Sequence, residues 1–90
     1  MDMGSPAAKA MMDGMDKMDR DMKAAPMNGN ADHDFASMMI PHHQGAVDMA
    51  EVELKYGKDP AMRRLAREIV AAQKKEIAQM QTWLKRHETH

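Results

Sequence analysis

The sequence predicts an all-α fold: an antiparallel bundle of three helices in which a short methionine-rich helix precedes a long helical hairpin. Apolar residues recur every three to four positions in three separate stretches, and no stretch shows the alternation of a half-buried strand. Residues that start and stop helices bound each stretch. The connections are short, which favours antiparallel neighbours. With 90 residues, the chain is expected to form a single domain over 1–90.

Local signals place the ends of the helices. Ser5 followed by Pro6 suits a helix start, because Ser caps the first turn and Pro needs no hydrogen-bond partner at the first position. Gly57 suits a helix end, and Pro60 suits a new start. Pro41 falls inside the second helix and is expected to kink it or loosen one turn. The predicted helices span residues 5–24, 31–56 and 60–87.

Methionine is the unusual feature of the composition. The chain has 13 Met and no Cys, against 9 residues of Leu, Ile and Val together. Met is flexible and specifies core packing poorly, whereas its thioether suits Cu(I) and other soft ions. Thioethers also cannot be lost to disulfide formation in an oxidising compartment. The composition therefore predicts soft-metal binding in the periplasm or another extracytoplasmic compartment. This location requires a mature form without its leader, and the alternative is a cytosolic chain.

Charge and hydropathy argue against several other classes. A balance of 13 basic and 14 acidic residues gives no basic excess for nucleic acid. No apolar run approaches the roughly 20 residues that a membrane span needs, and the N-terminus lacks the charged-then-apolar layout of a signal peptide. Glu-x-x-His, Gly-rich phosphate-loop and Cys-nucleophile motifs are absent. Ser37 is expected on the outer face of its helix, so we predict no enzyme activity.

The segment 38–43 contains two methionines followed, after Ile and Pro, by a double histidine. On a helix, Met38 lies one turn from His42, and Met39 lies one turn from His43. Each pair can then direct two donor atoms at one ion. The alternative is that these residues belong to an ordinary core helix.

Folding the helices back on each other about tight connections brings further donors to this segment. Met18 is expected level with Met38, and His43 level with Gln73. Carboxylates and amides suit harder ions, so Glu76 or Gln73 is expected to accept the second ring N–H of His43 rather than bind the metal. The competing account is a water-filled seam in which both side chains reach solvent. One layer would thus hold the predicted site: Met15, Met18, Met38, Met39, His42, His43, Gln73, Glu76 and Met80.

The apolar residues of the second helix cover more of its circumference than packing against a single neighbouring helix would bury. Phe35, Met49 and Tyr56 lie on a face that adjoins the inward one, so this helix must be flanked on at least two sides. Gly45 lies at the margin of the arc and permits the close approach of another helix. We therefore expect the three-helix unit to associate as a homodimer.

The run M-I-P-H-H-Q-G-A occupies residues 39–46, and Asp34-Phe35 precedes it. Matching positions follow in the third helix at Ala66, Ile69, Gln73, Glu76-Ile77, Met80 and Trp83-Leu84. Over residues 30–87 this pattern resembles the domain-of-unknown-function family 305, a ferritin-like helical family of bacterial, mostly exported proteins. The family includes CopM-like periplasmic proteins that bind copper and silver and assist metal tolerance. The resemblance implies the same role here, with five carried-over ligands: Met39, His42, His43, Met49 and Met80.

Copper is therefore the expected ion, with Cu(I) favoured and Ag(I) or Cu(II) as alternatives, bound for buffering, transfer or tolerance. Another metal-transfer protein is a further expected partner. The competing hypothesis is a structural or protein-interaction module whose methionine surfaces are adaptable contacts. A third hypothesis is a Zn or Cu(II) site built from histidines alone.

Overall fold

A computed structural model describes residues 4–87 of the chain, and these residues form three helices and no strand. The predicted all-helical fold is confirmed to this extent. The bounds agree with the predicted ranges to within one residue at each end; the ends of the predicted domain, residues 1–3 and 88–90, lie outside the described part. The helices are α1 (Pro6–Lys23), α2 (Ala31–Tyr56) and α3 (Pro60–His87).

Side chains at the helix starts satisfy backbone N–H groups that the helix itself leaves unpaired. The Ser5 hydroxyl accepts from the backbone N–H of Ala8 at 3.0 Å, and the Asp59 carboxylate accepts from that of Met62 at 3.0 Å. Asn30 caps α2 in the same way. The helix then continues without interruption through Pro41. These local contacts explain why the helix ends follow from the sequence.

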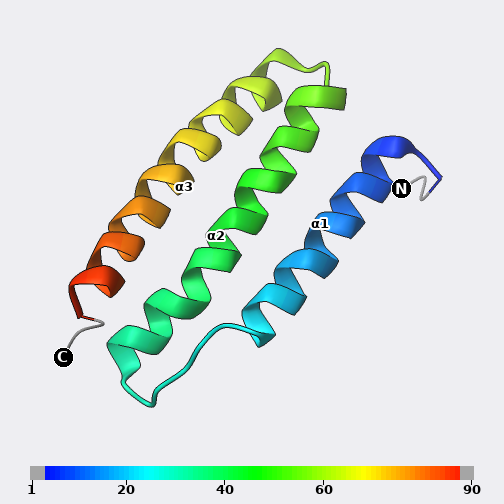
Figure 1. The fold of residues 1–90 in the computed structure, drawn as a ribbon. Helices are drawn as coiled ribbons and strands as arrows, with labels where there is room; N and C mark the ends of the chain where they lie inside the picture. The colour runs from blue at the N-terminus through cyan, green and yellow to red at the C-terminus, as the bar shows by residue number, and fades with distance from the viewer. Residues whose placement is uncertain (1–3, 88–90) are drawn as a thin grey trace.

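The three helices lie side by side as a layer one helix thick (Figure 1). Helix α2 occupies the middle and packs against both neighbours, whereas within the described chain no Cα atom of α1 lies within 8 Å of a Cα atom of α3. Consecutive helices run in opposite directions in Figure 1. The molecule measures 48 × 24 × 15 Å along its principal axes. Its core is correspondingly thin and consists mainly of small side chains, namely Ala8, Ala36, Val47, Ala50, Ala66 and Ile77.

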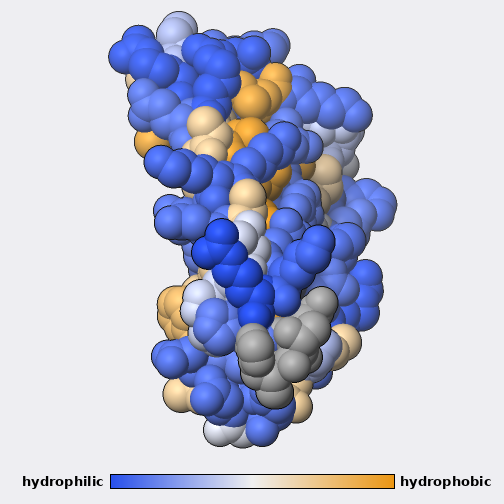
Figure 2. All heavy atoms as spheres, turned by 60° about the vertical axis from the view of Figure 1, so that its left-hand side comes forward, coloured by the Kyte–Doolittle hydropathy of each residue, from blue (hydrophilic) through white to orange (hydrophobic). Residues whose placement is uncertain are grey.

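A single layer leaves one broad apolar face of α2 uncovered. Phe35, Met49 and Tyr56, expected to be flanked by other helices, are 65%, 39% and 38% exposed. Met62 and Leu65 of α3 are also exposed. Figure 2, turned to bring the α3 side forward, shows a mostly hydrophilic surface with hydrophobic residues gathered in a seam in its upper part. The predicted flanking of α2 on at least two sides is confirmed, because α1 and α3 pack against it from two opposite sides, and the face that carries these exposed side chains is left uncovered.

The level of α1 against α2 differs from the prediction. Met18 lies against Gly45 rather than level with Met38, about two helical turns further along α2. The connection 24–30 is not a tight turn but runs beside the start of α2 (Figure 1). There the Ser37 hydroxyl donates to the carbonyl oxygen of Pro26 at 2.6 Å. Ser37 is consequently only 8% exposed, which corrects its predicted place on the outer face.

Two glycines, one within α2 and one directly after it, have steric roles. A Cβ added at Gly45 would lie 2.6 Å from the sulfur of Met18, so the helix that approaches Gly45 closely is α1 of the same chain. Gly57, which follows α2, has extended backbone angles, and a Cβ there would collide with the Glu53 carboxylate.

No helix within residues 4–87 is both long and apolar enough to cross a membrane.

Candidate metal centre

A cavity of about 240 Å³ lies between α1 and α2. Methionine is the most frequent residue in its lining that carries a potential metal ligand. Its potential metal donors are the thioethers of four methionines and one imidazole. Glycine and alanine make up the rest of the wall. Met15 is 46% exposed and Met49 39% exposed, so the cavity opens at the uncovered face. The donor residues are Met11, Met15, Met18, His42 and Met49.

Helical spacing brings these donors together. Met11, Met15 and Met18 follow one another at intervals of four and three residues, which places them on one side of α1. His42 and Met49 are seven residues apart on α2, two turns along one face. Small residues opposite them, including Gly14 and Gly45, leave the space that the flexible thioethers occupy. We call this set the methionine–histidine cavity.

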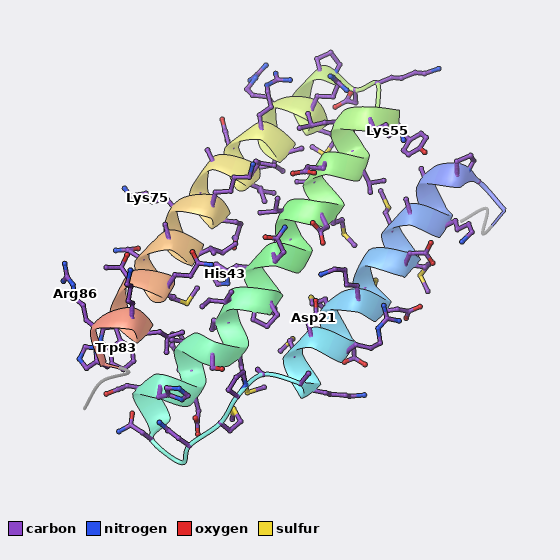
Figure 3. The ribbon with its side chains drawn as sticks, in the orientation of Figure 1. Asp21, His43, Lys55, Lys75, Trp83 and Arg86 are labelled. Carbon is purple, nitrogen blue, oxygen red and sulfur yellow. The ribbon has the colours of Figure 1, made fainter. Side chains whose placement is uncertain are left out.

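His43 points to the other side of α2, toward α3 (Figure 3). Its Nδ1 lies 2.9 Å from the carbonyl oxygen of Met39, and its Nε2 lies 2.6 Å from Oε1 of Glu76. The ring centroids of His42 and His43 are 6.0 Å apart, with an angle of 60° between the planes. Successive helical residues differ by about 100° in direction, so the double histidine is divided between two seams. The two imidazoles, which were predicted to share one site, therefore face different helices.

The two contacts of His43 occupy both nitrogens of its ring. Nδ1 faces the Met39 carbonyl oxygen, and Nε2 faces the Glu76 carboxylate. Neither ring nitrogen is open to a metal in this arrangement. Ligation by Nε2 requires the Glu76 side chain, which is 50% exposed, to rotate away.

The predicted contact between Glu76 and His43 is present, whereas its role beside a bound metal stays a prediction. Gln73 does not take that place. Its Oε1 is buried and has no hydrogen-bond partner among residues 4–87, although the residue as a whole is partly exposed.

The remaining predicted ligands lie outside the methionine–histidine cavity. Met80 lines a separate cavity of about 380 Å³ between α2 and α3, together with Phe35 and Trp83. Met38 and Met39 do not line the methionine–histidine cavity, and Met39 contributes its carbonyl to His43. The structure thus brings together Met15, Met18, His42 and Met49 from the predicted set. The structure adds Met11 to this set. Met11 lies on the same side of α1 as Met15 and Met18, so its spacing in the sequence could have identified it.

Charged groups around the cavity pair with one another locally. Lys17, next to Met18 in the chain, donates to Asp21 at 2.7 Å, and this hydrogen bond with its ion pair raises the pKa of Lys17. Within the described residues, no group of three or more His, Asp or Glu side chains is placed to hold a metal ion.

The sequence comparisons assign the family. The family model described as "Domain of unknown function (DUF305)" matches residues 1–87, and the chain belongs to this family. A similar protein is "Uncharacterized protein L153" of Acanthamoeba polyphaga mimivirus, which is 36% identical over 53 residues. The matched region covers 59% of this chain but 35% of the viral protein, so it spans about a third of that relative.

Proposed function

We propose that the methionine–histidine cavity binds a soft metal ion, with Cu(I) favoured and Ag(I) or Cu(II) as alternatives. The observation that carries this proposal is the convergence of four thioethers and one imidazole on one cavity whose lining includes no carboxylate. Cu(I) prefers such soft ligands, whereas Mg²⁺ and Ca²⁺ require oxygen donors. The role is buffering, transfer or tolerance of copper in an extracytoplasmic compartment, with no catalysis, and another metal-transfer protein is the expected partner.

His42 and His43 have different roles in this proposal. His42 lines the cavity and supplies its imidazole donor. His43 instead connects α2 to α3 through Glu76, and both of its ring nitrogens are already engaged. Of the ligands implied by the family resemblance, His42 and Met49 belong to the proposed site, and Met39, His43 and Met80 do not.

The proposed assembly is a homodimer in which a second copy covers the open face and completes an antiparallel bundle. The support is the layer itself, only 15 Å thick, with Phe35, Met49 and Leu65 exposed on it. Covering these side chains removes apolar area from water and shields the thioethers of the cavity. Gly45 no longer supports the dimer, because α1 of the same chain occupies that close approach.

The test is an anaerobic Cu(I) titration against a competing chelator. Replacing Met15 and Met18 together by Leu nearly preserves side-chain volume, so the fold is expected to survive while Cu(I) affinity falls by at least tenfold. Met12→Leu is the matched control, because Met12 is exposed on the same helix and does not line the cavity. A second comparison uses Met38 and Met39, both changed to Leu, which is expected to spare binding.

Unchanged affinity in the Met15 and Met18 double variant contradicts the proposed site. Absence of Cu(I) binding in the unmodified protein favours the competing function, a protein-interaction module. The exposure of Met15, Met27 and Met62, at 46%, 55% and 48%, is the observation that keeps this alternative open, since flexible methionine surfaces adapt to varied partners.

A further inference from the structure

A second methionine cavity, of about 310 Å³, lies beyond the first toward the α2–α3 connection. All three helices contribute to it. Met11 comes from α1, Met49 and Glu53 come from α2, and Met62 comes from α3. Met49 and Glu53 are four residues apart, so they lie one turn from each other on the same face of α2. Apart from Glu53, the lining residues are apolar.

The Glu53 carboxylate is the unusual member of this cavity. Its Oε2 is buried and has no hydrogen-bond partner within the described chain. Gly57 leaves room for this carboxylate, because a Cβ at that position would collide with it. The guanidinium of Arg63 is directed elsewhere and donates to the carbonyl oxygens of Leu54 and Gly57, at 2.6 and 3.2 Å. A buried carboxylate oxygen in apolar surroundings is costly unless a cation or a donor faces it.

We propose that Glu53, with the thioethers of Met62, Met49 and Met11, forms a second binding site for a soft monovalent cation. The ion class rests on the proposed function, whereas the site itself rests on the buried, unpartnered Oε2 of Glu53 and on the three methionines that line the same cavity. The carboxylate neutralises the charge of the ion, and the thioethers select a soft ion over a hard one. One carboxylate among thioethers cannot provide the six or more oxygen ligands that Ca²⁺ takes.

The two cavities share part of their walls. Met11 and Met49 line both, whereas Met18 and His42 line only the first and Met62 only the second. The shared thioethers therefore lie between a neutral site and a site with a carboxylate. This arrangement gives a bound ion a path of soft ligands from one site to the other.

The test follows Ag(I), added as silver nitrate, by NMR of protein labelled with ¹³C at the methionine methyl groups. We expect two equivalents of Ag(I) to bind and the methyl resonances of Met18 and Met62 to shift. In Glu53→Gln, which is nearly isosteric, the Met62 response and one equivalent are lost and the Met18 response remains. Glu51→Gln is the matched control, because Glu51 is exposed and lines neither cavity, and it is expected to keep both responses.

A double variant, Met18→Leu with His42→Ala, separates this inference from the proposed function. It is expected to lose the first site and to keep the Met62 response. If Met18 responds in the unmodified protein and Met62 does not, the second site alone is overturned. If neither responds, both proposals fail. If Glu53→Gln alters only the sedimentation of the protein, Glu53 serves contact between copies and the metal assignment is wrong.

Discussion

The two seams along α2 are held together by different kinds of contact. Polar contacts connect α2 to α3: the Arg63 guanidinium donates to two carbonyl oxygens at the end of α2, and His43 contacts Glu76. Among the described residues, no side-chain hydrogen bond joins α1 to α2. Apolar packing of thioethers and small residues, such as Met18 against Gly45, forms that seam instead.

This difference separates a scaffold from an adaptable site. Directional hydrogen bonds fix the level of α3 against α2, whereas flexible methionine side chains permit small adjustments of α1 at modest cost. The proposed site lies in the seam that can adjust its donors around an ion. Three pairs of variants test the contrast between the seams, and a single variant tests the connection between α1 and α2.

The largest effect is expected for Arg63→Ala in the polar seam. The guanidinium satisfies carbonyl oxygens of Leu54 and Gly57 that the end of α2 leaves without helical partners. Losing hydrogen bonds from a charged donor is expected to lower the free energy of unfolding by about 2 kcal/mol. Chemical denaturation measures the change, with Arg64→Ala, at an exposed neighbour, as the control. Equal effects in the two variants would refute a special role for Arg63.

The double histidine offers the sharpest test of the division between seams. His42→Ala is expected to weaken Ag(I) binding by about tenfold, equivalent to about 1.4 kcal/mol, with little change in stability. His43→Ala is expected to do the reverse, because it loses the contacts with Met39 and Glu76 but removes no donor from the methionine–histidine cavity. Silver titration and denaturation of both variants check this. The opposite pattern would place the metal in the α2–α3 seam.

Two glycines test how closely α1 packs on α2. A Cβ at Gly45 would lie within 3.0 Å of three Met18 atoms, whereas one at Gly14 would meet only the Cβ of Asp48, at 3.9 Å. Alanine favours a helix by up to about 1 kcal/mol over glycine, and overpacking costs about 1–3 kcal/mol. Gly14→Ala is therefore expected to raise the thermal midpoint, and Gly45→Ala to lower it. A higher midpoint for Gly45→Ala would show that Met18 moves aside freely.

The smallest effect on stability is expected from the pH-dependent contacts of Asp34 with the connection between α1 and α2. Asp34 accepts from His33 Nδ1 at 3.0 Å and from the backbone N–H groups of Asn28 and Gly29, at 2.9 and 3.1 Å. The hydrogen bond with His33 and those from the backbone lower the pKa of Asp34. Because its pKa is lower in the folded state, the ionised carboxylate stabilises the fold above its ordinary pKa of about 4, and this contribution is lost as pH falls toward the folded value.

The measurement compares the unmodified protein with Asp34→Asn by urea denaturation near neutral pH and near pH 3. The difference in the free energy of unfolding between the two proteins is expected to shrink on acidification. Other carboxylates titrate in both proteins, so their contributions largely cancel in this difference. A difference that stays constant with pH would show that the Asp34 contacts add nothing measurable to stability.

Local chemistry determined the helices, and the sequence shows that chemistry directly. The hydroxyl of Ser5 and the carboxylate of Asp59 each bond to a backbone N–H three residues further along the chain, so these caps do not depend on how the helices pack. The level of α3 against α2 was also predictable to within about one turn, since His43 was expected opposite Gln73 and lies against Glu76. A three-residue connection between Tyr56 and Pro60 leaves little freedom for a larger shift.

Tertiary structure alone decided the level of α1 and the composition of the cavities. The longer connection 24–30 can turn back or run alongside α2, and the Ser37 contact with Pro26 shows that it runs alongside. That path moves Met18 from Met38 to Gly45 and gives the cavity its present lining. Sequence spacing gives the direction of each side chain around its own helix, which is why His42 and His43 diverge. It cannot give the offset between two helices, because that offset depends on contacts between residues far apart in the chain.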